Sequence, residues 1–325
     1  MDAIEVQRAA NVEAGSLNRL AILFPTDFSP EAEGAWQYAL GLARAVGGEL
    51  RLLHVVAVPP KVVGDGVIID AAAVTRSWRA EAQAALAGLA ESARRQGVIT
   101  RADVADGTAI REVIRYAQEH ATDLIVMGTR GWVGFDAVGG SVTAGVARLA
   151  PCPVVAMPPR IEHTRLPRMV TIDRILVPLD GSSLGERALP VVSRLVKRFA
   201  AEVLLLRTAW AHTLLSTRPA EAELQVVEAA EHYLAAVADR LAVAGVPCRQ
   251  AVRYGHPVAE ILDHARTNRA DLIVMATHGR GGLARTLLGS IAGRVVSRAP
   301  VPVLLIGPHV TAGEGHATGA TLRAA

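Results

Sequence analysis

The chain has 325 residues, which is long for a single hydrophobic core and suits two domains. Hydrophobic residues make up 51% of the chain but aromatic residues only 4%, so the core must consist of small aliphatic side chains, as in helices packed on a parallel sheet. The net charge of +3, without a dense basic segment, argues against a dedicated nucleic-acid-binding protein.

The sequence also bears on the cellular compartment of the protein. No apolar run reaches the ~18–20 residues that a membrane-spanning helix needs, and the N-terminus lacks the hydrophobic segment of a secretory signal. The two cysteines, Cys152 and Cys248, cannot form the framework of a disulfide scaffold, which indicates a reducing compartment. We therefore expect a cytoplasmic protein that binds neither membrane nor nucleic acid.

In chain order, residues 1–18 show no pattern and are expected to form an N-terminal extension. A strand is predicted over 20–27, a helix with Ser29 as its N-cap up to about Val46, and a second strand over 49–56. A long Ala-rich helix over 70–96, a third strand over 98–105 and a third helix from Gly107-Thr108 follow. A buried strand, a glycine-rich loop, another helix and a short strand over 151–157 complete this half. The proline-rich segment 159–170 is predicted to be a linker.

The second half repeats this order of elements. Asp27 corresponds to Asp180, 153 residues later, whereas Asp123 corresponds to Asp271, 148 residues later. The difference falls in a loop while the strands stay aligned, as expected for a duplicated domain. In this half the spacing of polar residues predicts a capping box that begins at Ser183.

Each half therefore alternates strand and helix through four strands and ends in a fifth, short strand. Right-handed crossovers make this pattern a doubly wound, parallel α/β sheet. We predict two tandem Rossmann-like domains, over 19–158 and 171–308, and a disordered tail over 309–325. Ligands of such sheets bind beyond the carboxyl ends of the strands, where the strand order reverses.

Two sequence features meet at that edge in each half: an aspartate that ends the first strand, and a glycine-rich loop after the fourth. In the second half the loop runs from Gly279 to Gly289-Ser290, which opens an amphipathic helix. Strand, glycine loop and helix N-terminus together gather backbone N–H groups around a phosphate. A lone Gly-x-x-Gly is usually only a turn, and Asp27 and Asp180 alone would be read as caps of the turns that follow them. Their convergence is what indicates a site.

Both halves resemble universal stress protein (UspA-type) domains, over roughly residues 18–308. The resemblance rests on Pro-Thr-Asp at 25–27, Pro-Leu-Asp at 178–180, Leu-Leu-His-Val at 52–55, two Asp-Leu-Ile-Val-Met strands and the glycine-rich loops. It implies the fold of adenine-nucleotide α-hydrolase-like domains and a role in the stress response.

ATP-binding members of this family carry Gly-x2-Gly-x9-Gly-(Ser/Thr) in the loop. The second half keeps Gly279 and the nine residues before Gly289-Ser290, but Ala276 replaces the first glycine. The first half has both early glycines, but its loop is one residue short before Gly140-Ser141. Because Arg280 can balance phosphate charge, we rank the second site above the first.

The resemblance implies ATP, with or without magnesium, as a regulatory or structural ligand. Adenine and ribose would lie near the aspartate, the end of the second strand and the end of the fourth; the loop and helix N-terminus would hold the phosphates. The implied residues of the second half are Pro178, Leu179, Asp180, Thr208, Met275, Ala276, Gly279, Arg280, Gly289, Ser290 and Ile291. Those of the first half are Pro25, Thr26, Asp27, Val55, Met127, Gly128, Gly131, Gly140, Ser141 and Val142.

Catalysis finds no support in the sequence. No metal-ligand spacing, no serine-histidine-aspartate pattern and no P-loop lysine is present, so we assign neither catalytic residues nor metal ligands and expect at most a weak ATPase. The alternative function is that of a stress protein that acts as an interaction scaffold and does not bind ATP. An enzyme of the related adenine-nucleotide hydrolase group is less favoured.

The resemblance also implies that fifth strands pair across two domains. Here Val154–Met157 and Val303–Ile306 can pair within one chain and form an intramolecular pseudo-dimer, with a homodimer as a further possible assembly. Each is otherwise an apolar edge strand with unpaired backbone groups. We expect Val303→Lys to separate the halves, or to expose an aggregation-prone strand edge, without unfolding either core.

Overall fold

The computed structural model describes residues 19–57, 63–64, 67–68, 71–129, 142–159, 161, 169–209, 219–279 and 289–310. The predicted extension over 1–18, the tail beyond 310 and most of the linker lie outside these residues. So do residues 130–141 and 280–288 of the two glycine-rich loops.

The elements follow the predicted order in both halves. In the first half they are β1 (Ala21–Pro25), α2 (Ala32–Val46), β2 (Glu49–Val56), β3 (Val63–Gly64), β4 (Val67–Ile68), α3 (Ala71–Arg95), β5 (Ile99–Asp106), α4 (Ala109–Glu119), β6 (Leu124–Gly128), α5 (Val142–Leu149) and β7 (Val154–Met157). In the second half they are β8 (Arg174–Pro178), η2 (Gly185–Ala188), α6 (Leu189–Phe199), β9 (Glu202–Ala209), α7 (Pro219–Val243), β10 (Cys248–Tyr254), α8 (Pro257–Thr267), β11 (Leu272–Ala276), α9 (Ser290–Arg298) and β12 (Val303–Ile306).

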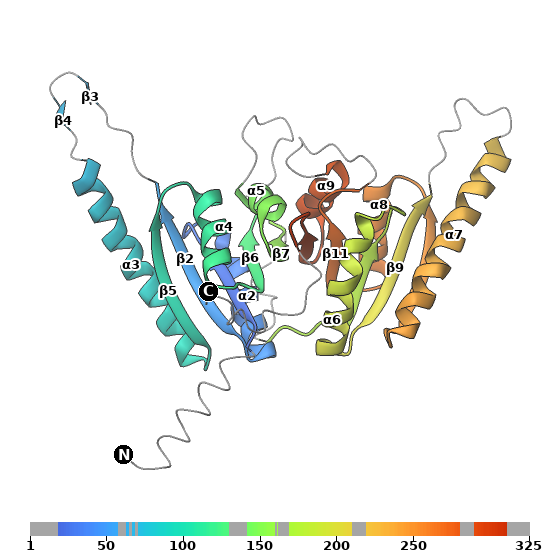
Figure 1. Cartoon of the computed structure of the whole chain (residues 1–325), viewed down its shortest axis with the longest axis horizontal. Coiled ribbons are helices and arrows are strands. Elements are labelled where there is room, and N and C mark those ends of the chain that lie inside the picture. Colours follow the sequence, from blue (N-terminus) through green and yellow to red (C-terminus); the bar gives the residue numbers. More distant parts are fainter. Residues whose placement is uncertain are drawn as a thin grey trace, which may run out of the picture.

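Ten of the described strands form one continuous sheet in the order β10-β9-β8-β11-β12-β7-β6-β1-β2-β5 (Figure 1). Within each half the neighbours in this sheet are parallel, and β1 and β8 lie where the strand order reverses. The predicted class, two tandem doubly wound α/β domains, is therefore confirmed. The switch points lie between β1 and β6 and between β8 and β11.

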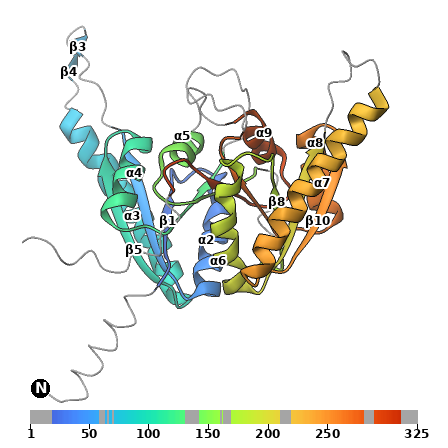
Figure 2. The same cartoon turned by 45° about the vertical axis from the view of Figure 1, so that its right-hand side comes forward.

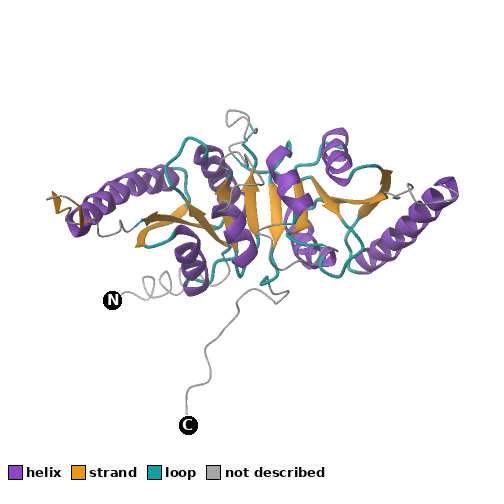
Figure 3. Ribbon diagram, turned by 90° about the horizontal axis from the view of Figure 1, so that it is seen from above, coloured by secondary structure: helices purple, strands orange, loops and turns teal. Residues whose placement is uncertain are grey.

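Helices cover both faces of this sheet (Figure 3). One buried cluster joins alternate strand residues such as Ile22 and Phe24 to α2, α3, α6 and α7, whereas Leu23 faces a second cluster with α4, α5, α8 and α9. Because strand side chains alternate between faces, strands covered on both sides are apolar throughout. Each cluster contains residues of both halves, so the two cores are continuous across the middle of the chain.

The halves join through their fifth strands. β12 pairs with β7 in antiparallel register, with Val303 opposite Ala156 and Leu305 opposite Val154. The intramolecular pseudo-dimer expected from the sequence is therefore what the structure contains. On one face α2 and α6 flank the junction (Figure 2), and on the other α5 and α9 lie side by side.

Two expected helix starts are wrong. Ser29 is not an N-cap, because α2 begins at Ala32 after Glu31, and the Ser29 amide instead donates to Asp27. The capping box at Ser183 is also absent: a 3-10 turn starts at Gly185, whose amide donates to the Ser182 hydroxyl at 3.0 Å. In both halves the turn after the first strand is built on the aspartate, which competes with helix capping.

Three further boundaries differ from expectation. β3 and β4 pair as a short antiparallel hairpin within a stretch predicted as loop. The last residue of the predicted linker, Val170, packs against the first half: its side chain is buried and its amide donates to the Gly41 carbonyl of α2. The start of the predicted disordered tail is packed, since Val310 is only 6% exposed. Among the described helices, none has the length and apolarity to cross a bilayer.

Candidate functional site

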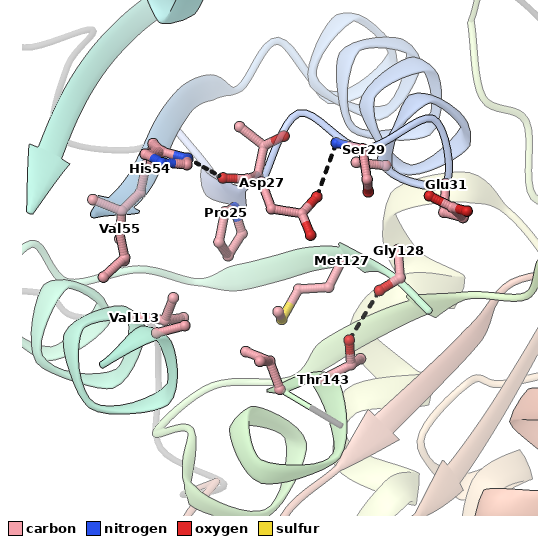
Figure 4. A pocket seen from close by; sticks show the side chains of 15 residues that line it. Pro25, Asp27, Ser29, Glu31, His54, Val55, Val113, Met127, Gly128 and Thr143 are labelled. Carbon is pink, nitrogen blue, oxygen red and sulfur yellow. Dashed lines mark hydrogen bonds between the residues drawn. The ribbon is translucent and has the colours of Figure 1, made fainter. Parts of the chain in front are cut away.

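A cavity of about 500 Å³ opens at the carboxyl edge of the first half, next to its switch point. It brings together seven predicted site residues from the ends of three strands and the start of α5: Pro25, Thr26, Asp27, Val55, Met127, Gly128 and Val142 (Figure 4). This size is typical of small-molecule sites. Residues that stand far apart in the sequence thus meet at one concave surface.

The turn after β1 holds Asp27 at this cavity. Its Oδ1 accepts a hydrogen bond from the Ser29 amide at 3.0 Å, and the Thr26 hydroxyl accepts from the Phe28 amide at 3.0 Å. The Thr26 carbonyl lies 2.8 Å from Nδ1 of His54, which must carry the proton because a carbonyl only accepts. The Phe28 ring stacks on His54 with 4.7 Å between ring centroids. The carboxylate is therefore fixed in place before any ligand arrives.

Phe28 occupies a strained backbone position, with φ of +60°. Its counterpart in the second half is Gly181, which adopts a similar φ of +80° without the penalty of a Cβ. The stacking on His54 offsets part of the cost of the left-handed conformation in Phe28. Strain of this kind is common at ligand sites.

The opposite wall of the cavity is built by β6 and α5. The Thr143 hydroxyl donates to the Gly128 carbonyl at 2.9 Å (Figure 4), which ties the first turn of α5 to the end of β6. A Cβ added at Gly128 would lie 2.8 Å from the Glu31 carbonyl oxygen, so glycine lets β6 approach the start of α2 closely. Val142 begins α5 and is 41% exposed, so its side chain can be changed without disturbing the core.

Eight residues that line the cavity were not predicted as site residues. They are Ser29, Glu31, Ala32, Leu53, His54, Ala109, Val113 and Thr143. His54 belongs to the Leu-Leu-His-Val motif and could have been predicted as a site residue from it. Ala109 and Val113, which come from α4, belong to no motif. Two carboxylates, Asp27 and Glu31, line the cavity together with no described lysine or arginine.

The second half builds the same edge with different side chains. Asp180 Oδ1 accepts from the amide and the hydroxyl of Ser182 at 3.0 and 2.6 Å. A Cβ added at Gly279 would collide with Asp180 Oδ2, so this carboxylate lies directly against that glycine of the loop. Arg207 replaces His54; its guanidinium lies 4.5 Å above the Tyr233 ring and close to Gly181. Burial, and then the nearby Glu186, raise the pKa of Tyr233, so its phenol stays neutral.

Ala276, which replaces the first glycine of the loop pattern, ends β11 in extended backbone and has no positive φ. Because the backbone there is not left-handed, an alanine Cβ carries no conformational strain at this position. The departure from the glycine pattern is therefore tolerated by the backbone.

Gly289, which the resemblance implies as a phosphate-binding residue, makes a backbone hydrogen bond to Thr277, just after β11. Its amide donates to the Thr277 carbonyl at 2.9 Å, and a Cβ there would lie 2.8 Å from the same oxygen. The glycine thus closes the loop onto β11, and its N–H is not free for a phosphate. A bulky residue at this position would first collide with Thr277 and not with a ligand. The open amides of the first turn of α9 begin at Ser290 and Ile291.

The remaining predicted residues divide into two groups. Pro178, Thr208 and Met275 lie at the carboxyl ends of β8, β9 and β11, as the prediction requires, but the Leu179 side chain is buried in the core. Arg280, Gly131, Gly140 and Ser141 lie outside the described residues.

Comparison with known proteins explains the repeated architecture. The sequence profile described as Universal stress protein family matches residues 19–158 and 171–307. The chain belongs to the universal stress protein family. It is 28% identical over 311 residues to a universal stress protein of Mycobacterium tuberculosis, covering 88% of this chain and 96% of the relative. It is 33% identical over 138 residues to one of Methanocaldococcus jannaschii, covering 41% of this chain and 81% of that protein.

A solved structure shares the tandem arrangement. The crystal structure of a universal stress protein from Archaeoglobus fulgidus matches with a TM-score of 0.64 at 25% identity, covering 88% of this chain and 96% of that chain. The tandem arrangement is therefore shared with this solved relative.

Proposed function

We propose that this tandem universal stress protein binds ATP as a regulatory or structural ligand at the carboxyl edge of its sheet. The observation that carries the proposal is the cavity of about 500 Å³ that unites Asp27, Val55, Met127, Gly128 and Val142 at the switch point of the first half. The family membership supports it, because nucleotide binding is common in the family.

The residues present fit an adenine nucleotide. Pro25, Val55, Val113 and Met127 offer an apolar slot for a base, and Asp27 supplies a fixed acceptor for a ribose hydroxyl. The N-terminus of α5 provides backbone amides and the positive end of a helix dipole for phosphates. Glu31 adds negative charge to the same cavity, so a nucleotide would bind here with its phosphate charge reduced by magnesium.

Val142 gives the most direct test of this placement. Val142→Glu should weaken ATP binding in the first half roughly tenfold, because it sets a negative charge beside the phosphates. The helix itself should not suffer, because an acidic residue in the first turn is favourable. Calorimetric titration with magnesium and ATP measures the affinity and the stoichiometry.

Two control variants sharpen the result. Val142→Gln has the same shape without the charge and should bind ATP nearly as well as the unmodified protein. Ile291→Glu makes the equivalent change in the second half, since Ile291 corresponds to Val142, and should affect the other site alone. Equal affinities for Val142→Glu and Val142→Gln would place the phosphates elsewhere. Absence of ATP binding in every form would favour the interaction scaffold that does not bind ATP.

Turnover should be slow or absent. The described lining of the cavity holds no lysine or arginine that could stabilise the charge of a phosphoryl transition state. We expect an ATP hydrolysis rate well below the ~1–10³ s⁻¹ of ordinary enzymes. Release of phosphate from labelled ATP with magnesium measures it, and a rate within that range would contradict a purely regulatory role for the ligand.

A further inference from the structure

A second cavity, of about 350 Å³, lies between the two halves, beyond the ends of β11 and β12. Arg148 of α5 reaches it from the first half, and η2, the end of β11 and the segment after β12 enclose it from the second. It shares no lining residue with the cavity at Asp27, but it includes Ala276, one of the residues implied for nucleotide binding in the second half. α5 and α9 lie side by side above this part of the sheet (Figure 1).

The lining of this interdomain cavity is basic. Arg148, Arg187, His278 and His309 contribute to it, and the other described lining residues are apolar, small or hydroxylic, with no carboxylate among them. The nearest acidic residue in sequence, Glu186, is engaged elsewhere, because its Oε2 accepts from Arg240 at 2.6 Å. No described residue that lines the cavity therefore balances the charge of the two arginines.

Arg148 is the residue that most directly indicates a ligand in this cavity. A basic residue in the last turn of a helix is ordinary, because the helix dipole favours a cation there. What is not ordinary is that its Nε is buried and has no hydrogen-bond partner among the described residues. A buried N–H of a charged group left unsatisfied is costly, and an oxyanion in the cavity would satisfy it. Arg187 already uses one Nη1 bond on the Pro308 carbonyl, at 2.8 Å, which fixes its guanidinium at the same opening.

The duplication itself does not explain these charges. At the pseudo-symmetric positions the chain has Ser297 in place of Arg148, 149 residues later, and Gly34 in place of Arg187, 153 residues earlier. The two arginines are thus a feature of one side of the junction only. A structural need common to both sides would have placed a similar residue at both.

We infer that the interdomain cavity binds a small dianion, a phosphoryl group or a dicarboxylate, through Arg148 and Arg187. Two guanidinium groups match two negative charges and can each offer paired N–H donors to an oxyanion. The histidines at the same cavity add further donors. Because the ligand would contact residues of both halves, it would also stabilise their junction.

The inference can be tested on the full chain with inorganic phosphate and with malonate as probes. Titration calorimetry gives the affinity, and the side-chain NMR signals of His278 and His309 report whether the probe enters this cavity. Arg148→Met keeps the aliphatic stem but removes the charge, and should weaken binding about tenfold or more. Arg187→Met, at an exposed position, is a second variant that leaves the buried core untouched.

Arg95→Met is the matched control. Arg95 also lies in the last turn of a helix, α3, but its side chain is 65% exposed and forms an ion pair with Glu91 on the surface. It should bind the probes as the unmodified protein does. Repeating the titrations with saturating ATP separates this cavity from the proposed nucleotide sites, since binding here should persist.

Sensitivity of phosphate binding to Arg148 and Arg187 would support a phosphoryl ligand, and the same sensitivity with malonate a dicarboxylate. Binding of neither probe, binding that is equal in Arg148→Met and Arg95→Met, or binding that ATP abolishes would overturn the inference. Loss of ATP binding alone would count against the proposed nucleotide function and leave this cavity unaffected.

Discussion

Replacing Val303 with lysine should lower the free energy of unfolding by about 4 kcal/mol or more, because it buries an ammonium group without a partner. Val303 is fully buried in β12, between Ile273 of β11 and Ala156 of β7. The sequence suggested that this change would only separate the halves. The structure corrects that expectation, because both faces of β12 are covered and the new side chain would enter the core.

Val243→Lys is the matched control, since Val243 ends α7 and is 91% exposed. It should change the stability by less than about 0.5 kcal/mol. Denaturant titration followed by circular dichroism compares the two variants. A Val303→Lys protein that unfolds at the midpoint of the control would show that β12 is not part of the cooperative core.

The fold could be predicted because the same order of strands and helices occurs in both halves, so that each half supports the assignment of elements in the other. Asp123 and Asp271 occupy equivalent positions before the fourth strand, and both carboxylates accept backbone amides at the start of the first strand of their half, at 2.8–2.9 Å. A shared side-chain role of this kind keeps the two copies aligned. Apolar strands and amphipathic helices then leave few alternatives to a doubly wound sheet.

Local details of the structure were harder to predict from the sequence than the fold. The starts of α2 and η2 were misjudged because an aspartate two residues before a serine competes for the same backbone amides. Ala276 departs from the glycine pattern, and whether its methyl group is tolerated depends on the backbone φ, which is not positive there. The motif alone does not give that dihedral angle.

The two cavities differ in how far they could be predicted from the sequence. Asp27, Gly128 and Val142 could be placed at one cavity from strand ends and loop motifs alone, because parallel topology brings those ends together. The basic interdomain cavity could not, since Arg148 and Arg187 belong to different halves and meet only through the pairing of β7 with β12. The sites of a tandem protein that lie between its copies are invisible to motifs within one copy.

Gly307→Ala should loosen the junction between the halves and lower the free energy of unfolding by about 2 kcal/mol. A Cβ at Gly307 would lie 2.5 Å from the Ala147 carbonyl oxygen of α5, a distance at which one of the two segments must move. Both are backbone, so neither can yield by changing a rotamer. The added methyl group should therefore act as a wedge between β12 and α5.

Gly88→Ala makes the same chemical change where there is room. Gly88 lies inside α3, and nothing lies within 4 Å of an added Cβ, so this substitution should stabilise the protein by about 0.5–1 kcal/mol. Thermal unfolding should shift Tm in opposite directions for the two variants. A protease site introduced into the linker adds a second readout: after cleavage the unmodified protein should migrate as one particle in gel filtration, and Gly307→Ala should release its halves at lower dilution. A Gly307→Ala protein that keeps the unmodified Tm would show that α5 and β12 yield to the methyl group, and that close approach at Gly307 does not hold the halves together.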